Sequence, residues 1–408
     1  MQYLQKNDRQ IYNLIQKEEK RQYSEVRLIP SENYTSKAVM EASGSVLTNK
    51  YSEGYAGKRY YQGQVYIDEI EILAKTRAEE LFKVSHANVQ PYSGSPANLA
   101  CYMALLEPGD KIMGMTLTSG GHLTHGASVS AIGKLFEIVP YTVSEKTGLL
   151  DFDELEKIAI KEKPKLIIAG YTAYPRKVSF SKFKAIAKKV GAYLHADIAH
   201  ISGLIVSGEH PSPSPHADTI MTTTHKSLRG PRGAMIMCNS KLAQDIDRAV
   251  FPGLQGGPHD NTTAAIAVAL KEALGSDFRK YGKQVVRNAQ ALAEGLQEIG
   301  LKLSTGGTDT HLILADVTPL GLIGKQAAVA LEKAGLIVNA NTIPFDKRSP
   351  FSPSGIRLGT PAITTLGMKE KEMKEIVKFI KEVFDHVDND RKLKQVRKEV
   401  EEFMASYR

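Results

Sequence analysis

The order of hydrophobic and polar positions divides the chain into segments of two kinds. In residues 8–21 and 67–81, apolar side chains recur every three or four positions, which predicts amphipathic helices. Residues 166–171, 192–196 and 219–223 are short apolar or β-branched runs that predict buried strands, with helical segments interspersed. This alternation predicts an α/β fold in which a mostly parallel central sheet is flanked by helices. The ligand of such a sheet binds beyond the carboxyl ends of its strands.

The last third of the chain has strands and helices of its own. Short strands are expected at residues 301–304 and 311–316, and helices at 325–334 and over the apolar positions of 373–387. We therefore expect an N-terminal helix and arm, a large domain and a smaller α+β C-terminal domain. Their predicted boundaries are residues 1–45, 46–275 and 276–408.

Composition and charge exclude several classes of protein. The chain has 408 residues, of which 42% are hydrophobic and 24% charged, as in globular proteins. A net charge of +8 is mild at this length, and there is no RNA-binding motif or long basic block, so we expect no nucleic-acid partner. No apolar run approaches the roughly 20 residues of a membrane helix, and we expect neither a membrane span nor a signal peptide. Cys101 and Cys238 lie in apolar surroundings typical of reduced, buried thiols, which favours a cytoplasmic location.

One lysine stands where a strand reaches a turn. A threonine-rich run ends at His225 and Lys226, and the glycines and proline of 230–233 stop the strand. Lysine forms Schiff bases with carbonyl compounds, and its amine loses a proton more readily when it is desolvated or close to cations. Because Arg229 and Arg232 are also near in sequence, Lys226 is a candidate nucleophile. The alternative is a solvated turn with a few basic residues.

Two glycine-containing segments are suited to binding. The Gly94-Ser95 turn leads through Pro96 into a helix, with Ser95 as the expected N-cap. Free N–H groups at a helix start suit a phosphate, although an ordinary capped helix has the same sequence pattern. His122 lies among glycines that allow a planar ligand to approach. A metal site formed with His125 is less favoured, because no nearby Cys, Asp or Glu completes it.

A third segment, residues 49–61, contains four tyrosines, two glycines and the carboxylate of Glu53. It is either a tyrosine-rich surface loop or a loop that brings phenols and a carboxylate to a pocket.

Pyridoxal phosphate would use these features together. The cofactor needs a lysine for its aldehyde, a carboxylate for its pyridine nitrogen, donors for its phosphate and a flat partner for its ring. Lys226 and Asp197 both follow predicted strands and provide the first two. Arg357 could hold the carboxylate of an amino-acid substrate, because a guanidinium binds a carboxylate with two hydrogen bonds. Gly94-Ser95 and the Gly256-Gly257 turn are assigned to the phosphate, and His122 to the ring.

The chain resembles the serine hydroxymethyltransferase family from about residue 28 to the C-terminal helices. The resemblance is most specific in the run Thr-Thr-Thr-His-Lys-Ser-Leu-Arg-Gly-Pro-Arg-Gly at 222–233. It implies the fold-type I, aspartate aminotransferase-like architecture of pyridoxal-phosphate enzymes. It also implies glycine hydroxymethyltransferase activity, which moves the serine hydroxymethyl carbon to tetrahydrofolate and gives glycine and 5,10-methylenetetrahydrofolate. The expected assembly is a homodimer with shared active sites, or a tetramer of the same subunits. Further matching segments are 93–98, 120–126, 197–200, 251–258 and 355–361.

The resemblance also implies roles for individual residues. Lys226 holds the cofactor aldehyde, Asp197 pairs with the pyridine nitrogen, and Glu53 is an acid/base contributed from the partner subunit; His122 and His225 complete the catalytic set. The cofactor-binding positions are Tyr51, Gly94, Ser95, His122, Asp197, His200, Thr223, Lys226, Gly256 and Gly257, with Tyr51 and the two last glycines coming from the partner subunit. The substrate-binding positions are Ser31, Tyr61, His200, Arg232 and Arg357. The folate-binding positions are Leu117, Gly121, His122, Leu123, Asn341, Ser349, Pro350 and Phe351.

Four features depart from the family pattern. Gln62 stands where glycine is common, and Thr172 where serine is common. Pro258 is followed by His259-Asp260-Asn261 where Leu-x-His is usual, and Phe345 stands where a small or polar residue is usual. The nearest alternative function is a folate-independent pyridoxal-phosphate aldolase for β-hydroxy amino acids, similar to threonine aldolase, which would not need the folate positions. An alternative of another class is a nucleic-acid-binding protein without catalysis, which only the net charge supports.

Overall fold

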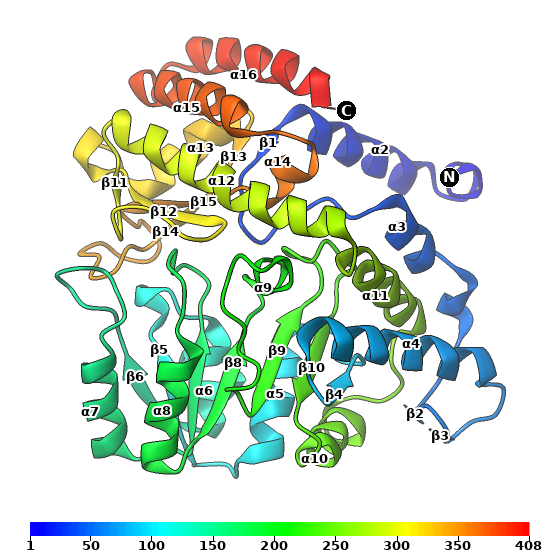
Figure 1. Ribbon diagram of the computed structural model, residues 1–408. Coiled ribbons are helices and arrows are strands. Elements are labelled where there is room, and N and C mark those ends of the chain that lie inside the picture. Colours follow the sequence, from blue (N-terminus) through cyan, green and yellow to red (C-terminus); the bar gives the residue numbers. More distant parts are fainter. Residues whose placement is uncertain (408) are drawn as a thin grey trace.

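The apolar runs of the sequence form a seven-stranded sheet in the computed structural model, which describes residues 1–407 (Figure 1). The strands lie in the order β4-β10-β9-β8-β7-β5-β6, and all neighbours are parallel except where β10 pairs with β4 and β9. The predicted mostly parallel α/β sheet is confirmed. The strands are β4 (His86–Asn88), β5 (Lys111–Met115), β6 (Glu137–Tyr141), β7 (Leu166–Gly170), β8 (Tyr193–Asp197), β9 (Thr219–Thr223) and β10 (Ala234–Cys238).

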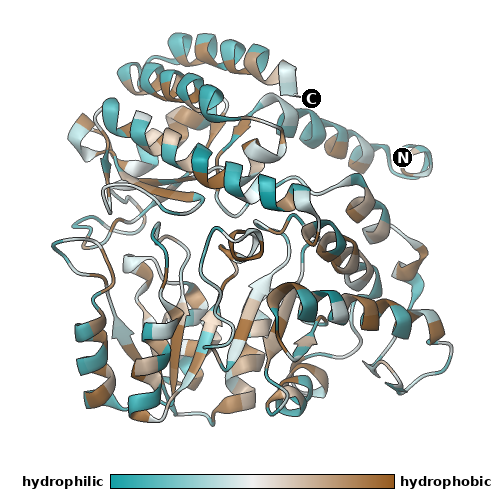
Figure 2. Cartoon of the chain, in the orientation of Figure 1, coloured by the Kyte–Doolittle hydropathy of each residue, from teal (hydrophilic) through white to brown (hydrophobic). Residues whose placement is uncertain are grey.

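Strand β7 shows why the central strands are apolar throughout. Leu166 and Ile168 pack against helix α5 on one face of the sheet, whereas Ile167 and Ala169 pack against α7 and α8 on the other face. Because successive side chains of a strand point to opposite faces, a strand covered on both sides has no solvent-facing position. Helices such as α7 and α8 instead carry hydrophilic residues on their outer side (Figure 2). The helices around this sheet are α4 (Val65–Phe82), α5 (Gly94–Leu105), α6 (Ala131–Leu135), α7 (Phe152–Glu162), α8 (Phe180–Val190), α9 (Ser202–Ser207), α10 (Ala243–Arg248) and α11 (Asp260–Ala273).

A second core surrounds a smaller antiparallel sheet of order β11-β12-β15-β14. The N-terminal arm adds Val26 and Leu28 to this core, and β1 (Val26–Arg27) pairs with β13 (Leu336–Ile337). Its elements are β11 (Lys302–Leu303), β12 (Leu312–Asp316), β14 (Asn339–Asn341), β15 (Gly355–Gly359), α13 (Gly324–Lys333), α14 (Pro361–Thr365), α15 (Glu370–Asp385) and α16 (Asp390–Met404).

Helix α12 (Ser276–Glu298) joins the two cores. Phe278 and Val285 near its start pack into the core of the large sheet, and Leu292 and Leu296 near its end pack into the second core. In Figure 1, α12 runs along the boundary between the two sheets. The domain boundary predicted at 275/276 therefore coincides with the start of a helix that both cores share, and the three-domain division stays a prediction.

The N-terminal segment is helical, as predicted. Asp8 caps α2 (Arg9–Ser24) by accepting a hydrogen bond from the N–H of Ile11. Two shorter helices, α1 (Gln2–Asn7) and α3 (Lys37–Ser43), precede and follow it. The tyrosine-rich segment of residues 49–61 contains a small hairpin of β2 (Gly54–Tyr55) and β3 (Lys58–Arg59).

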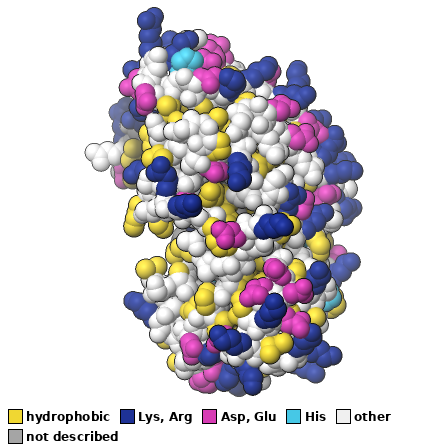
Figure 3. Space-filling model, turned by 90° about the vertical axis from the view of Figure 1, so that its left-hand side faces the viewer, with side chains coloured by type: hydrophobic (Ala, Val, Ile, Leu, Met, Phe, Trp, Pro, Cys, Tyr) yellow, Lys and Arg dark blue, Asp and Glu magenta, His cyan; other side chains and the backbone are white. Residues whose placement is uncertain are grey.

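Acidic and basic side chains are interspersed on the face drawn in Figure 3, rather than gathered into one basic stripe. Within residues 1–407, no helix combines the length and the apolar character that crossing a membrane requires. Cys101 and Cys238 are both buried and unpaired, as expected.

Candidate active site

Lys226 lies in the turn that follows β9, half-buried in a pocket beyond the carboxyl end of the sheet. Burial lowers the pKa of its amine to about 8; Asp197 opposes the shift, whereas Arg357 and Arg232 add to it. Arg229 is not among the groups that shift this pKa, and its Cζ lies over the Tyr281 ring, 4.4 Å from the centroid. Desolvation, more than the basic residues next to it in sequence, is thus the main reason why this amine gives up its proton.

Asp197 ends strand β8 and is held by three donors. His125 Nε2 and Asn98 Nδ2 each lie 2.9 Å from Oδ2, and the N–H of Ala199 lies 3.1 Å from Oδ1. Burial raises the pKa of Asp197, but the hydrogen bond from His125, the electrostatic effects of His125 and His122 and the hydrogen bond from Asn98 together hold that pKa well below its usual range. The carboxylate is therefore a buried anion that faces the pocket.

The hydrogen bonds fix which nitrogen of each nearby histidine carries the proton. A backbone N–H can only donate, so His125 Nδ1 accepts from the N–H of His122 at 3.1 Å, and Nε2–H donates to Asp197. Likewise, Asn98 Oδ1 can only accept, so the proton of His195 is on Nε2, 2.9 Å away. Both histidines are neutral donors in this arrangement. The negative charge of Asp197 is left for a positively charged ligand atom.

Three more histidines line the pocket as neutral rings. Burial lowers the pKa of His122 to about 4, that of His225 to about 3 and that of His200 well below its ordinary value. His122 Nδ1 accepts a hydrogen bond from the N–H of Thr124 at 3.2 Å, so its other nitrogen carries the proton. Nδ1 of His200 and Nδ1 of His225 are buried without a partner in the described chain. Buried polar atoms of this kind suit a ligand that supplies the missing hydrogen bonds.

The pocket has a volume of about 270 Å³. Ten of the predicted site residues line it, although they come from five separate segments of the sequence. They are Ser31, Gly94, Ser95, His122, Asp197, His200, Thr223, His225, Lys226 and Arg232.

Arg357 reaches the pocket from the smaller sheet. Its Nη1 donates to the carbonyl of Thr172, which lines the pocket, at 2.7 Å, and its Nε donates to Asn339 Oδ1 at 3.1 Å. Burial lowers the pKa of Arg357 to about 10, so the group remains charged at neutral pH. Within residues 1–407, Nη2 has no hydrogen-bond acceptor, which leaves it free to bind a substrate carboxylate.

The phosphate end of the predicted site lies at the start of α5. The helix begins at Gly94, with Ser93 at the N-cap position and no side-chain capping bond, so the expected N-cap at Ser95 is wrong. A Cβ at Gly94 would lie 2.8 Å from Thr223 Cγ2, which explains the need for glycine here. Because no side chain caps the helix, its first N–H groups remain free for an anion.

The other predicted residues form a separate cluster in the same chain. Tyr51 Oη donates to Glu53 Oε1 at 2.7 Å, and Cβ atoms at Gly256 and Gly257 would lie 3.2 Å from these two side chains. Tyr51 and Tyr61 are 56% and 48% exposed, and their rings meet edge to face. None of these five residues lines the pocket of Lys226 in the described chain. One chain therefore carries two parts of the predicted site at different places.

Of the predicted folate positions, His122 lines the pocket, and the others lie outside it. Leu117 and Leu123 are 47% and 45% exposed, and Phe351 is 88% exposed. Gly121 is a structural requirement, because a Cβ there would lie 2.1 Å from the carbonyl oxygen of Met115. The remaining folate positions are Asn341 on β14, and Ser349 and Pro350 in the loop before β15.

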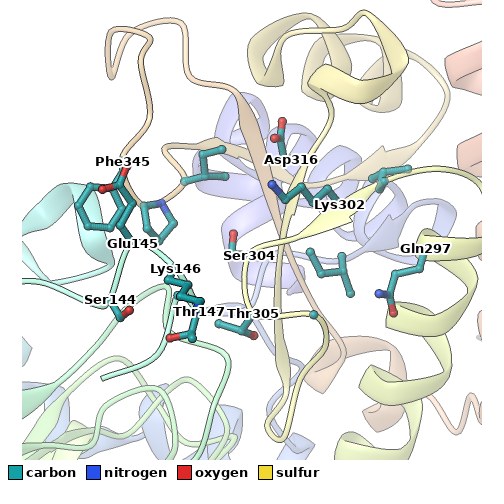
Figure 4. Close-up of a pocket in the computed structure, with 16 residues that line it drawn as sticks. Ser144, Glu145, Lys146, Thr147, Gln297, Lys302, Ser304, Thr305, Asp316 and Phe345 are labelled. Atoms are coloured by element: carbon teal, nitrogen blue, oxygen red, sulfur yellow. The ribbon is translucent and has the colours of Figure 1, made fainter. Parts of the chain in front are cut away.

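A larger cavity of about 620 Å³ lies where residues 144–148 approach residues 301–306 (Figure 4). Its charged side chains have mixed sign, and Lys302 and Asp316 lie beside each other where β11 pairs with β12 (Figure 4). Its lining contains none of the predicted catalytic residues.

Sequence reasoning missed three residues around Asp197. The sequence suggested His125 only as a possible metal ligand. In the described chain, no group of three or more His, Cys, Asp or Glu side chains could hold a metal. His195 carries a signal, because it lies two positions before Asp197 and so on the same face of β8. Asn98 gives none, because its contact with Asp197 depends on how α5 packs against the sheet.

Comparison with known proteins agrees with this geometry. The family model described as "Serine hydroxymethyltransferase" matches residues 4–380. A serine hydroxymethyltransferase of Desulfotalea psychrophila is 56% identical over 98% of this chain and 93% of that protein. One of Acidothermus cellulolyticus is 60% identical over 92% of this chain and 88% of that protein, and one of Sorangium cellulosum is 55% identical over 98% and 95%.

A desolvated lysine and a buried aspartate at the carboxyl ends of neighbouring strands of this sheet define a fold-type I pyridoxal-phosphate enzyme. More narrowly, the chain belongs to the serine hydroxymethyltransferase family. The predicted family and its glycine hydroxymethyltransferase activity are confirmed, and the folate-independent aldolase is not favoured.

Proposed function

We propose that the pocket around Lys226 binds pyridoxal phosphate and transfers the hydroxymethyl carbon of serine to tetrahydrofolate, giving glycine and 5,10-methylenetetrahydrofolate. The observation that carries this proposal is the pairing of a lysine whose pKa is lowered to about 8 with the buried anion of Asp197 in one pocket. The amine suits an aldehyde, and the carboxylate suits a protonated ring nitrogen.

The pocket residues fit the cofactor. The unpaired Nδ1 of His200 is available to the ring hydroxyl, and the uncapped start of α5 at Gly94 is available to the phosphate. When bound, pyridoxal phosphate supplies an electron sink for negative charge that develops on the substrate. Asp197 would keep a proton on the ring nitrogen, and the neutral ring of His122 would face the cofactor ring. Lys226 would hold the aldehyde and could move protons at the substrate.

The serine carboxylate is held from the opposite side of the pocket. Arg357 supplies the charge and its free Nη2, and Ser31, His200 and Arg232 supply further polar contacts. Because Arg357 also donates to the carbonyl of Thr172, its guanidinium plane is fixed before substrate arrives. A fixed fork loses little conformational freedom on binding.

A second subunit completes the site. Tyr51, Glu53, Tyr61, Gly256 and Gly257 lie apart from the pocket of their own chain, and the two tyrosines are exposed. We propose a homodimer in which this cluster enters the partner's pocket, where Glu53 serves as the acid/base and Tyr51 contacts the phosphate. A tetramer of two such dimers would use the same contacts. The exposed Leu117, Leu123 and Phe351 would form part of the folate wall, and the two free cysteines suit the cytoplasm.

Serine turnover should depend on tetrahydrofolate. We expect purified protein supplied with pyridoxal phosphate to convert serine to glycine rapidly with tetrahydrofolate and only slowly without it, because the carrier accepts the one-carbon unit. The measurement is glycine formation with and without the carrier. Equal rates in both conditions would favour an aldolase and would contradict the proposed transfer.

Serine affinity should depend on the shape of the arginine side chain as well as on its charge. Arg357→Lys keeps a cation but loses the two-pronged guanidinium, so serine KM is expected to rise about tenfold to a hundredfold, which corresponds to loss of one charge-assisted hydrogen bond. Steady-state kinetics and serine titration of the cofactor absorbance measure this change. Arg287→Lys, in an ion pair with Glu370, is the matched control and should leave KM unchanged. An unaltered KM in Arg357→Lys would mean that another residue holds the carboxylate.

A further inference from the structure

The segment that departs from the family pattern contacts the loop that carries Glu53. Asp260 is the first residue of α11 and is 4% exposed, and both of its carboxylate oxygens lie near Ser52 Oγ, at 2.7 and 2.8 Å. Ser52 is completely buried and stands between Tyr51 and Glu53 in the sequence. The Ser52 hydroxyl donates one hydrogen bond to the carboxylate, shared between the two oxygens.

The two neighbours of Asp260 make contacts of their own. The ring of His259 stacks on Tyr92 with centroids 4.3 Å apart, and Tyr92 Oη donates to the carbonyl of Gly257 at 2.7 Å. Asn261 Nδ2 donates to the carbonyl of Ser43 at 2.7 Å. Residues 259–261 thus join the Gly256-Gly257 turn, the end of α3 and the Glu53 loop to the start of one helix.

Ser52 is well placed to control the direction of its neighbours. Tyr51 and Glu53 share a hydrogen bond with each other; in the single chain Tyr51 is exposed and Glu53 is half-buried. The backbone on either side is anchored, because Gln64 Nε2 donates to the carbonyl of Tyr51 at 3.0 Å and Arg59 Nη1 donates to that of Ser52 at 2.9 Å. The Ser52 side chain adds a link from this backbone to the start of α11.

We propose that Asp260 is a positioning residue that acts through Ser52 to hold Tyr51 and Glu53 in the orientation in which they enter the neighbouring subunit's pocket. This inference rests on the proposed role of Glu53. Burial raises the pKa of Asp260, whereas the Ser52 hydroxyl and the guanidinium of Arg59 favour its charged form. The start of α11 favours that form too, because a helix N-terminus attracts negative charge. His259 and Asn261, which stand where leucine and histidine are usual in the family, thus form with Asp260 a connected set of polar contacts.

The test compares Asp260→Ala, Ser52→Ala and Asp260→Asn in the full-length protein loaded with pyridoxal phosphate. The alanine variants should lower kcat for tetrahydrofolate-dependent serine cleavage about tenfold to a hundredfold, the loss expected when a catalytic group is displaced by about 1 Å. Serine KM should stay within about twofold of wild type, because Arg357 is untouched. Asp260→Asn keeps an oxygen acceptor for Ser52 and should restore most of kcat. The double alanine variant should be no worse than either single one, as expected for two partners of one contact.

Hydrogen–deuterium exchange of the peptide spanning residues 50–55 supplies a second readout. Exchange should accelerate in both alanine variants and remain close to wild type in Asp260→Asn. Asp218→Ala is the matched control, because Asp218 also accepts hydrogen bonds from a side chain and a backbone N–H, those of Lys184 and Leu194. It should change neither kcat nor exchange at 50–55.

The outcomes separate this inference from the proposed function. Unchanged exchange at 50–55 in both alanine variants would overturn the positioning role, and so would wild-type kcat with accelerated exchange. Glu53→Gln is measured beside them. If Glu53→Gln is fully active, the proposed role of Glu53 fails and the positioning role fails with it; if Glu53→Gln is inactive while Asp260→Ala is fully active, only the role of Asp260 is overturned.

Discussion

Replacing Lys226 with alanine is expected to lower serine turnover by about a hundredfold to ten-thousandfold, the range typical for a positioned proton-transfer group. The same change should remove the attachment point of the cofactor. Wild-type protein should be yellow and should lose that colour on treatment with borohydride, which makes the link between the lysine amine and the cofactor aldehyde permanent. Mass spectrometry should then find the cofactor on the peptide that contains Lys226. The physical reason is burial, which lowers the pKa of this amine to about 8 and leaves much of it unprotonated near that pH.

Lys188→Ala provides the control for this experiment. Lys188 is exposed in the last turn of α8, and its loss should change neither the colour nor the labelled peptide. Labelling of another lysine in the wild type would contradict the assignment of Lys226. A Lys226→Ala variant that turns over serine at the wild-type rate would do the same.

Mixing two inactive variants should restore activity if the site is shared between subunits. Lys226→Ala and Glu53→Gln each disable every site of their own homodimers. In a mixed dimer, one site carries both defects and the other carries neither, because Glu53 acts in the partner's pocket. Random exchange at equal ratio makes half of the dimers mixed, each with one intact site, so activity should approach about a quarter of wild type. The measurement is serine turnover after subunit exchange has been verified by native mass spectrometry.

Lys226→Ala mixed with Asp197→Ala is the matched control. Both residues line the pocket of one chain, so every site of every mixed dimer carries a defect and no activity should return. Failure of the first mixture to recover activity, with exchange verified, would move Glu53 into the pocket of its own chain. Recovery in the control mixture would show that Lys226 and Asp197 of different chains cooperate, which the single pocket excludes.

Several elements of the fold could be predicted because their signals are local. The strand Thr219–Thr223 has the predicted limits, and the helix predicted over residues 8–21 is present as Arg9–Ser24. The start of α5 lies two residues before the predicted one, because Ser95 and Pro96 suit several positions in a first turn equally well. The antiparallel pairing of β10 was not predicted, since an apolar run has the same pattern whichever direction its neighbour takes.

The sequence by itself determined which side chains carry the chemistry. Lys226 and Asp197 each end an apolar run, and alternating strands and helices bring the ends of such runs to one edge of a parallel sheet. The tertiary structure decided their chemical state. Burial, and not the neighbouring His225 or Arg229, is the main cause of the low pKa of Lys226, and His125 with Asn98 keeps Asp197 charged. These effects depend on distances between residues far apart in the chain, which no periodicity encodes.

The tertiary structure also decided which predicted residues meet. Arg357 reaches the pocket from a second sheet because its Nη1 bonds to the carbonyl of Thr172, 185 positions away. Tyr51 and Glu53 lie outside the pocket of their own chain, in a loop whose Ser52 is hydrogen-bonded to Asp260 at the start of α11. The sequence determines residue types and the ends of strands through local spacing, whereas desolvation and long-range hydrogen bonds arise only when the chain is packed.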